Sequence, residues 1–185
     1  MAKYGIRDIS EGETLLDRAM LLQGAFRSRV LAEVLHLRDG TFPDTWSSRE
    51  LPEVADLSSG GTPSRSGPDY FGPGHLWVKI GDLTEGEVAA TEESITASGL
   101  TNSSAEVLPA GTVLLAMYGA SIGRTGVLGL EAATNQAICA MRPRSSEIIP
   151  EYLLLVLQAS KETFVKGGYG GAQPKEASSI KWWVE

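Results

Sequence analysis

The sequence predicts an α/β (α+β) domain with a mixed β-sheet, preceded by a long amphipathic N-terminal helix. Apolar residues recur at steps of three or four from Thr14 to about Arg38, without a proline. After Trp46 the pattern changes to short apolar runs separated by glycine-containing turns. A chain of 185 residues with 42% hydrophobic content can bury one core and add a helical arm. We therefore expect a helical region over residues 1–42 and a domain over residues 43–185.

The predicted N-terminal helix carries a wide apolar stripe. Thr14 is a candidate N-cap, and Gly40 and Pro43 end the pattern. The positions expected to contact a partner helix in a coiled coil are Leu15, Leu22, Phe26, Val30 and Val34. The stripe is wider than contact with a single neighbour requires. Two interpretations stay open: the helix docks a partner helix, or it folds onto its own domain.

The domain that follows is predicted to contain strands and a second helix. The expected strands are His75–Ile80, Thr112–Met117, Ile122–Leu128 and Thr134–Met141. Pro150 and the acidic Glu151 are typical of a first helical turn, and we expect this helix to run to about Phe164. Trp77 is expected in the core. The glycine-rich connections cover residues 58–74, 118–126 and 167–175.

Composition argues against several classes of protein. The single cysteine, Cys139, cannot form an internal disulfide and is expected in the core. No closely spaced set of cysteines and histidines predicts a metal site. The sequence has neither the apolar run of a signal peptide near Met1 nor a run of 18 apolar residues. We expect a cytoplasmic protein without membrane contact.

No reactive constellation predicts an enzyme. His36 and His75 have no nucleophile and carboxylate at a recognised spacing. The segment from Gly119 to Thr125 is one residue short of a phosphate loop and has arginine where that loop needs lysine. We expect no catalytic residues, no metal and no cofactor bound by this chain.

The loop from Ser58 to Arg65 combines glycines, hydroxyls and an arginine. Such a loop can bring backbone N–H groups and a guanidinium close to phosphate or guanine. The net charge of −7 opposes strong phosphate binding. Between Leu83 and Val107 there are five acidic residues and no lysine or arginine, so we expect this stretch to lie away from phosphate. The charge predicts weak DNA binding by the chain alone.

Several motifs follow one another in a specific order. They are Gly60–Arg65, Tyr70–Phe71, Trp77–Asp82, Leu108–Leu114, Tyr118–Gly126, Thr134–Ile138, Glu151–Leu153 and Gly171–Gln173. In this order they resemble the target-recognition domain of type I restriction-modification specificity subunits, from about Pro43 to the end of the sequence. Before them, Ala25–Arg27 and Pro43–Trp46 resemble the end of that family's spacer helix and its entry into a recognition domain.

The resemblance implies that the chain directs catalytic partner subunits to a DNA target. In this family, specificity subunits carry two recognition domains in tandem, and their helices set the spacing between the two halves of a split DNA target. The expected partners are double-stranded DNA, modification (methyltransferase) subunits and restriction subunits. S-adenosylmethionine, ATP and Mg would belong to those partner subunits, which methylate adenine and cleave DNA. A second copy of the chain, or another specificity half, is a further expected partner.

The candidate DNA-binding residues combine placement in loops with suitable chemistry. They are Gly61, Thr62, Ser64, Arg65, Lys79, Tyr118, Ser121, Gly123, Arg124, Asn135, Gln136, Gln173 and Lys175. Arg65 and Arg124 can bind guanine or phosphate through two donors. Asn135 and Gln136 can pair with adenine, or they can cap neighbouring backbone groups instead.

The sequence shows one recognition domain where the family has two, and it stops where the family continues into another helix. A natural half-subunit, which two copies would complete into a symmetric reader of a palindromic target, is one expectation. A fragment or a truncated product is another. The alternative function is a protein-interaction or regulatory module without DNA recognition of its own. A free-standing enzyme is the least favoured reading.

Overall fold

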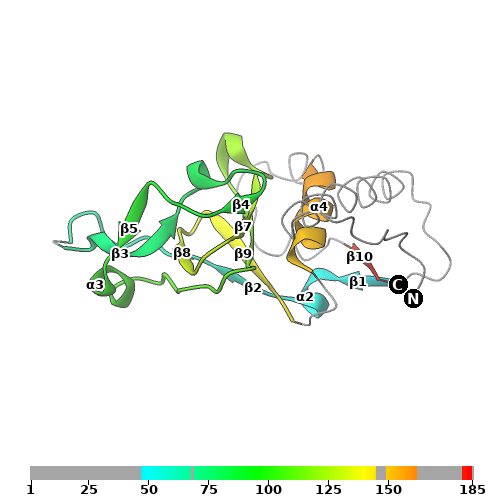
Figure 1. Cartoon of the computed structure of the whole chain (residues 1–185), viewed down its shortest axis with the longest axis horizontal. Coiled ribbons are helices and arrows are strands. Elements are labelled where there is room, and N and C mark those ends of the chain that lie inside the picture. Colours follow the sequence, from blue (N-terminus) through cyan, green and yellow to red (C-terminus); the bar gives the residue numbers. More distant parts are fainter. Residues whose placement is uncertain (1–46, 68, 145–148, 162–180, 185) are drawn as a thin grey trace, which may run out of the picture.

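A computed structural model describes residues 47–67, 69–144, 149–161 and 181–184. Within these residues two mixed β-sheets and a helix form an α/β arrangement (Figure 1). The predicted N-terminal helix and the domain boundary at residues 42 and 43 lie outside the described residues. No helix in the described part of the chain is long and apolar enough to cross a membrane.

The larger sheet has five strands in the order β2-β9-β6-β7-β4. Their bounds are β2 Ala55–Ser59, β4 Glu87–Val88, β6 Val113–Ala116, β7 Thr125–Leu128 and β9 Ile138–Pro143. The pairing of β4 with β7 is parallel, whereas the other pairings are antiparallel. The sheet is therefore mixed, as the sequence predicts.

The smaller sheet has the order β5-β3-β8. Its strands are β3 Phe71–Val78, β5 Glu93–Ile95 and β8 Ala132–Thr134. Strand β3 pairs antiparallel with β5 and parallel with β8. This sheet lies at one end of the molecule, beside the short helix α3 (Ala97–Thr101) (Figure 1).

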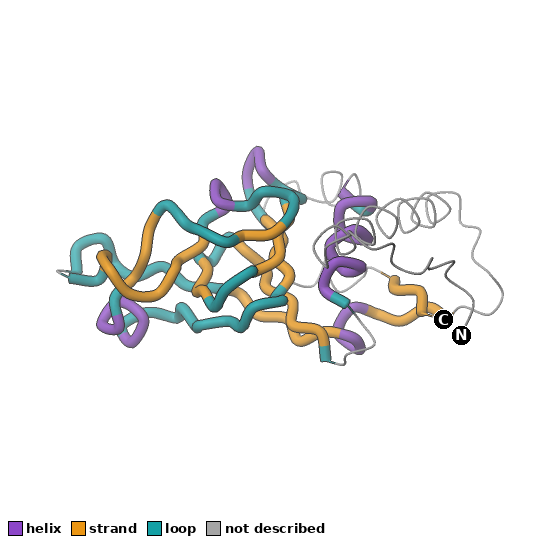
Figure 2. Tube along the Cα trace, in the orientation of Figure 1, coloured by secondary structure: helices purple, strands orange, loops and turns teal. Residues whose placement is uncertain are grey.

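The remaining elements flank the two sheets. They are β1 Ser47–Glu50, α2 Leu51–Val54, the 3-10 turns η1 Ile80–Asp82 and η2 Gly119–Ser121, α4 Pro150–Ala159 and β10 Lys181–Val184. Strands β1 and β10 pair antiparallel, so the two ends of the described chain meet. Figure 2 shows α4 standing between this pair and the larger sheet.

The core lies on both faces of the larger sheet. Side chains alternate along a strand, so the fully buried β6 supplies both faces. Val113 and Leu115 pack with the apolar face of α4, including Leu153. Leu114 and Ala116 join the cluster between the larger sheet and the residues around β3. The loops that connect these strands are therefore supported by a buried scaffold.

Two of the predicted strands need correction. Thr134–Met141 is not one strand, because Asn135 forms a turn with Ala137 and the chain passes from β8 in the smaller sheet to β9 in the larger one. The run Ile122–Leu128 becomes a strand only at Thr125, since the preceding residues close the turn after η2.

The other elements agree with the sequence more closely. Strand β6 lies within Thr112–Met117, and β3 overlaps His75–Ile80 but begins earlier, at Phe71. Trp77 is 2% exposed, which confirms its place in the core. Helix α4 begins at Pro150 as predicted and ends at Ala159, whereas Phe164 lies outside the described residues.

Candidate nucleic-acid interface

The loop between β2 and β3 is fastened at its base. The Gly61 N–H donates to the carbonyl oxygen of Thr134, the last residue of β8, at 2.9 Å. The indole Nε1 of the buried Trp77 donates to the Gly61 carbonyl oxygen at 3.0 Å. Gly61 itself is buried, while Thr62, Ser64 and Arg65 beyond it are exposed. The sheet therefore holds the base of the loop and leaves its polar residues at the surface.

Two predicted DNA-binding residues from distant segments meet at this loop. The Thr62 hydroxyl donates to Oε1 of Gln136, which lies in the turn between β8 and β9. The Ser59 hydroxyl also donates to the Gln136 carbonyl oxygen, at 3.3 Å. Both Thr62 and Gln136 are exposed. A hydroxyl and an amide, both able to exchange hydrogen bonds with base edges, thus lie side by side.

Asn135 adopts the backbone-capping role that the sequence left open. Its Oδ1 accepts from the Ala137 N–H at 3.1 Å, and its own N–H donates to the Val78 carbonyl oxygen at 3.0 Å. The side chain therefore shapes the β8–β9 turn. This turn places Gln136 at its exposed tip.

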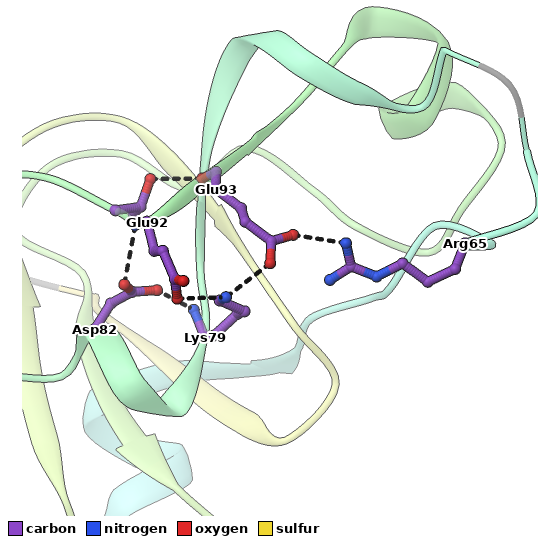
Figure 3. Close-up of polar contacts among 6 residues, drawn as sticks. Arg65, Lys79, Asp82, Glu92 and Glu93 are labelled. Carbon is purple, nitrogen blue, oxygen red and sulfur yellow. Dashed lines mark hydrogen bonds and ion pairs between the residues drawn. The ribbon is translucent and has the colours of Figure 1, made fainter.

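Arg65 is stacked and paired. Its Cζ lies 4.0 Å from the centroid of the Phe71 ring and 5.6 Å from that of Trp77. Its Nη1 lies 2.7 Å from Oε2 of Glu93 on β5 (Figure 3). The side chain nevertheless remains 57% exposed. The guanidinium is thus placed by a ring and a carboxylate while it still faces solvent.

Lys79 is held by two carboxylates, and one of them, Glu93, also pairs with Arg65. Its Nζ lies 2.8 Å from Oε2 of Glu92 and 2.8 Å from Oε1 of Glu93. These two carboxylates raise the pKa of Lys79, Glu92 first. Asp82 fixes the backbone on both sides of this group: its carboxylate accepts from the backbone N–H of Lys79 at 2.7 Å and from that of Glu92 at 3.1 Å (Figure 3).

Glu93 is the functional candidate that the sequence did not indicate. It comes from the acidic stretch that we expected to lie away from phosphate, and the structure places it directly against Arg65 and Lys79. The guanidinium of Arg65 and then the ammonium of Lys79 lower the pKa of Glu93 from 4.5 to about 2. The three-residue strand β5 that carries it gave no detectable pattern in the sequence.

A second group of predicted residues lies in the connection between β6 and β7. The Met117 N–H donates to the Ala137 carbonyl oxygen at 2.9 Å, which brings Tyr118 close to the β8–β9 turn. The Tyr118 side chain is 39% exposed. Ser121 follows in η2, and its carbonyl oxygen accepts from the Arg124 N–H at 3.0 Å.

Arg124 turns toward its own domain. Its Nη2 donates to the Leu83 carbonyl oxygen at 2.5 Å, and the side chain is half-buried. Gly123 has a φ of +80°, a conformation that L side chains rarely adopt, and it lies against Lys161. The hydrogen bond to Leu83 anchors Arg124 to backbone, whereas the side chain of Arg65 faces solvent.

A partly buried polar network lies next to this second group. Thr125 donates to Oε2 of Glu85 at 2.8 Å, and Gln158 on α4 donates to both Glu85 and Thr125. Lys161 lies 3.3 Å from Oε1 of Glu85. Since the network joins the strand to the helix, we assign it a structural role. None of these four residues was predicted as a site residue from the sequence.

Some predictions fall outside the described residues. They are Gln173, Lys175 and the partner-helix positions Leu15, Leu22, Phe26, Val30 and Val34. Within the described residues, no group of three or more histidine, cysteine, aspartate or glutamate side chains is arranged to hold a metal ion.

Comparison with known families gives one match over most of the chain. Residues 43–179 match the model of the type I restriction modification DNA specificity domain. The matched stretch contains the loop, the β8–β9 turn and the acidic segment described above.

Two curated proteins are similar to about two thirds or more of the chain. The type I restriction enzyme MjaIX specificity subunit of Methanocaldococcus jannaschii is 26% identical over 137 residues, covering 72% of this chain and 31% of that protein. The type I restriction enzyme HindI specificity subunit of Haemophilus influenzae is 22% identical over 125 residues, covering 67% of this chain and 27% of that protein. The matches therefore cover about a third or less of the length of these relatives.

Solved structures share the fold. One, which describes complex assembly and conformational transition of the type I R-M system, aligns with a TM-score of 0.64 at 20% identity. It covers 91% of this chain and 46% of that chain. The crystal structure of the HsdS subunit from Thermoanaerobacter tengcongensis aligns with a TM-score of 0.60 at 18% identity, covering 92% of this chain and 43% of that chain. These alignments confirm the predicted α/β class with mixed sheets.

Proposed function

Because the chain belongs to the family of type I restriction modification DNA specificity domains, we propose that it recognises one part of a DNA target sequence for catalytic partner subunits. A specificity domain is a non-catalytic component of its system, so the family confirms the expectation that the chain is not itself an enzyme. Target recognition requires exposed groups that contact base edges and a rigid support that fixes their positions.

The observation that carries the proposal is the pairing of exposed Thr62 and Gln136, with the stacked Arg65 in the same loop as Thr62. Hydroxyl, amide and guanidinium groups form hydrogen bonds with base edges in the major groove. Here the hydroxyl of the β2–β3 loop meets the amide of the β8–β9 turn, the same loop carries the guanidinium, and the buried Trp77 holds this loop at Gly61. Such a fixed set of donors and acceptors suits sequence recognition better than non-specific attraction.

The charge distribution supports recognition inside a complex. The chain has a net charge of −7, and Glu92 and Glu93 lie against the cations Lys79 and Arg65. This surface is therefore poorly suited to phosphate binding by itself. We propose that modification subunits provide most of the phosphate contacts, while this chain contributes the base contacts.

The proposed complex follows from the same role. Modification subunits would bring S-adenosylmethionine and methylate adenine, and restriction subunits would bring ATP and Mg and cleave DNA. The chain would bind none of these cofactors itself and would act with its partners in the cytoplasm, on double-stranded DNA. A second copy, or another specificity half, would provide recognition of the other half-site.

The ion pairs of Arg65 and Lys79 favour one competing function. If their carboxylates serve mainly to neutralise these cations, the chain would be a regulatory module that docks partner subunits without recognising DNA. This alternative predicts complex formation with no sequence preference.

Both functions can be tested in one experiment. The full chain is mixed with a type I modification subunit, S-adenosylmethionine and a randomised DNA library, and the methylated adenines are located by sequencing. We expect an enriched motif that disappears when the chain is omitted. A stable complex that methylates without any motif would support the regulatory alternative and contradict target recognition.

A further inference from the structure

Arg65 is the only basic residue of the loop from Gly60 to Gly67, and two contacts fix the orientation of its side chain. The Phe71 ring lies beneath the guanidinium, 4.0 Å from Cζ, and Glu93 lies 2.7 Å from Nη1. A ring restricts the plane of a guanidinium, and a carboxylate restricts its rotation within that plane. The side chain is therefore positioned before any DNA arrives.

Glu93 is itself firmly held. Its other oxygen, Oε1, lies 2.8 Å from Nζ of Lys79, and its residue pairs with Trp77 in the register between β5 and β3. The side chain is 28% exposed, about half as exposed as that of Arg65. With both carboxylate oxygens engaged by cations, Glu93 is suited to orient Arg65 more than to contact a base directly.

The aromatic support beneath Arg65, Phe71, is partly buried and packs against the core. Phe71 packs edge-to-face against Trp77, with ring centroids 5.6 Å apart, and Trp77 bonds to Gly61 at the base of the loop. The loop, its arginine and the platform under that arginine are thus connected through one buried residue. A displacement of the guanidinium would have to disturb this packing.

The remaining donors of Arg65 are available to a ligand. A guanidinium has five N–H donors, the ion pair is made through Nη1, and 57% of the side chain is exposed. Guanine presents O6 and N7 in the major groove at a spacing that matches two donors of a guanidinium. Phosphate gains little at this place, because Glu92 and Glu93 balance the positive charges of Lys79 and Arg65.

We propose that Glu93 is a positioning residue that holds Arg65 for the recognition of a guanine in the DNA target. This inference rests on the proposed function, and it assigns one residue pair to one base pair of the motif. Glu93 does not touch the DNA in this account; it acts through Arg65. Because its pKa is about 2, its carboxylate stays ionised at every pH at which DNA is bound.

The methylation experiment with the full chain and a modification subunit tests this assignment. Arg65→Ala removes the proposed guanine contact and should reduce discrimination at one base pair by roughly 5- to 150-fold. Glu93→Gln keeps the shape but removes the charge, and it should relax the same base pair by at least about fivefold. Arg65→Lys, which keeps the charge but loses the planar fork, should relax that base pair as well.

Glu106→Gln is the matched control, because it removes the same charge from an exposed residue of the acidic stretch between Leu83 and Val107, which also contains Glu93. It should leave the motif unchanged. If Glu93→Gln does not fold, as judged by thermal unfolding, Glu93→Asp replaces it. That variant keeps the charge but shortens the side chain by one methylene, and it must relax the same base pair.

Results that overturn only this inference can be distinguished from a result that also removes the proposed function. If Glu93 only neutralises Arg65, Glu93→Gln will increase affinity for all DNA sequences alike and will steepen the salt dependence. That result, or an unchanged motif in Glu93→Gln when Arg65→Ala relaxes one base pair, would overturn the inference and leave the proposed function standing. An unmodified chain that selects no motif would remove the proposed function and this inference with it.

Discussion

The indole N–H of Trp77 donates to the carbonyl oxygen of Gly61 at 3.0 Å, from a side chain that is only 2% exposed. This bond connects the core strand β3 to the loop that carries Thr62 and Arg65. The N–H of Gly61 in turn donates to the carbonyl oxygen of Thr134, at the end of β8. Gly61 thus links the loop to both β3 and β8.

Replacing Trp77 by phenylalanine should destabilise the fold. Phenylalanine retains an aromatic ring but leaves the buried Gly61 carbonyl without its donor, which costs about 1–3 kcal/mol in the free energy of unfolding. Urea unfolding followed by circular dichroism measures the difference. Ser66→Ala, an exposed change in the same loop, is the control and should stay within about 0.5 kcal/mol. Equal stability of Trp77→Phe and the unmodified chain would show that the bond does not anchor the loop.

Gly60→Ala should separate the loop from β8. A Cβ atom at this position would overlap the carbonyl and hydroxyl oxygens of Thr134, so the backbone must shift. We expect a loss of about 1–3 kcal/mol in the free energy of unfolding, measured by thermal or urea unfolding. Gly81→Ala is the matched control, because no atom lies within 4 Å of a Cβ built there. Similar losses for the two variants would contradict the close approach of Gly60 to Thr134.

The carboxyl of Glu93 should titrate well below its ordinary range. Its pKa is lowered from 4.5 to about 2, first by Arg65 and then by Lys79. Since the folded pKa lies below the unfolded one, its contribution to stability is full above pH 4.5 and is lost as the pH falls toward 2.

Carbon-13 NMR of labelled glutamate carboxyl groups measures the Glu93 midpoint directly. Arg65→Ala should raise the pKa toward 4.5, and Lys79→Ala should raise it by a smaller amount, in line with the order of the two contributions. An unshifted midpoint in the unmodified chain would mean that the Arg65–Glu93 pair does not persist in solution.

Cys139 should be unreactive until the protein unfolds. The side chain is fully buried in β9, and burial raises the pKa of its thiol to about 12. A disulfide reagent such as dithiobis(nitrobenzoic acid) should therefore label the one cysteine of the chain only in denaturant. Rapid labelling of the native chain would contradict the burial of β9.

Local sequence patterns predicted much of the scaffold. The apolar run around Val113 and the proline at 150 identified β6 and the start of α4, because strand and helix periodicities are local properties. The glycines and hydroxyls of the β2–β3 loop indicated its exposure, and the structure places Thr62, Ser64 and Arg65 at the surface.

Contacts between distant segments could not be predicted in this way. The pairing of Arg65 with Glu93 depends on the register of β5 against β3, and a three-residue strand leaves no periodic signal. The break between β8 and β9 was also hidden, because apolar residues stand on both sides of Asn135. Its side chain could extend a strand or cap a turn, and only the fold decides between the two.

The central claim is that the chain provides sequence specificity to a larger complex. It is tested most directly by measuring the affinity of the full chain with its modification subunit for the selected DNA site and for the same duplex with the motif scrambled, at one fixed salt concentration. We predict that the selected site binds at least roughly a thousandfold more tightly. Equal affinities for the two duplexes would contradict target recognition by this chain.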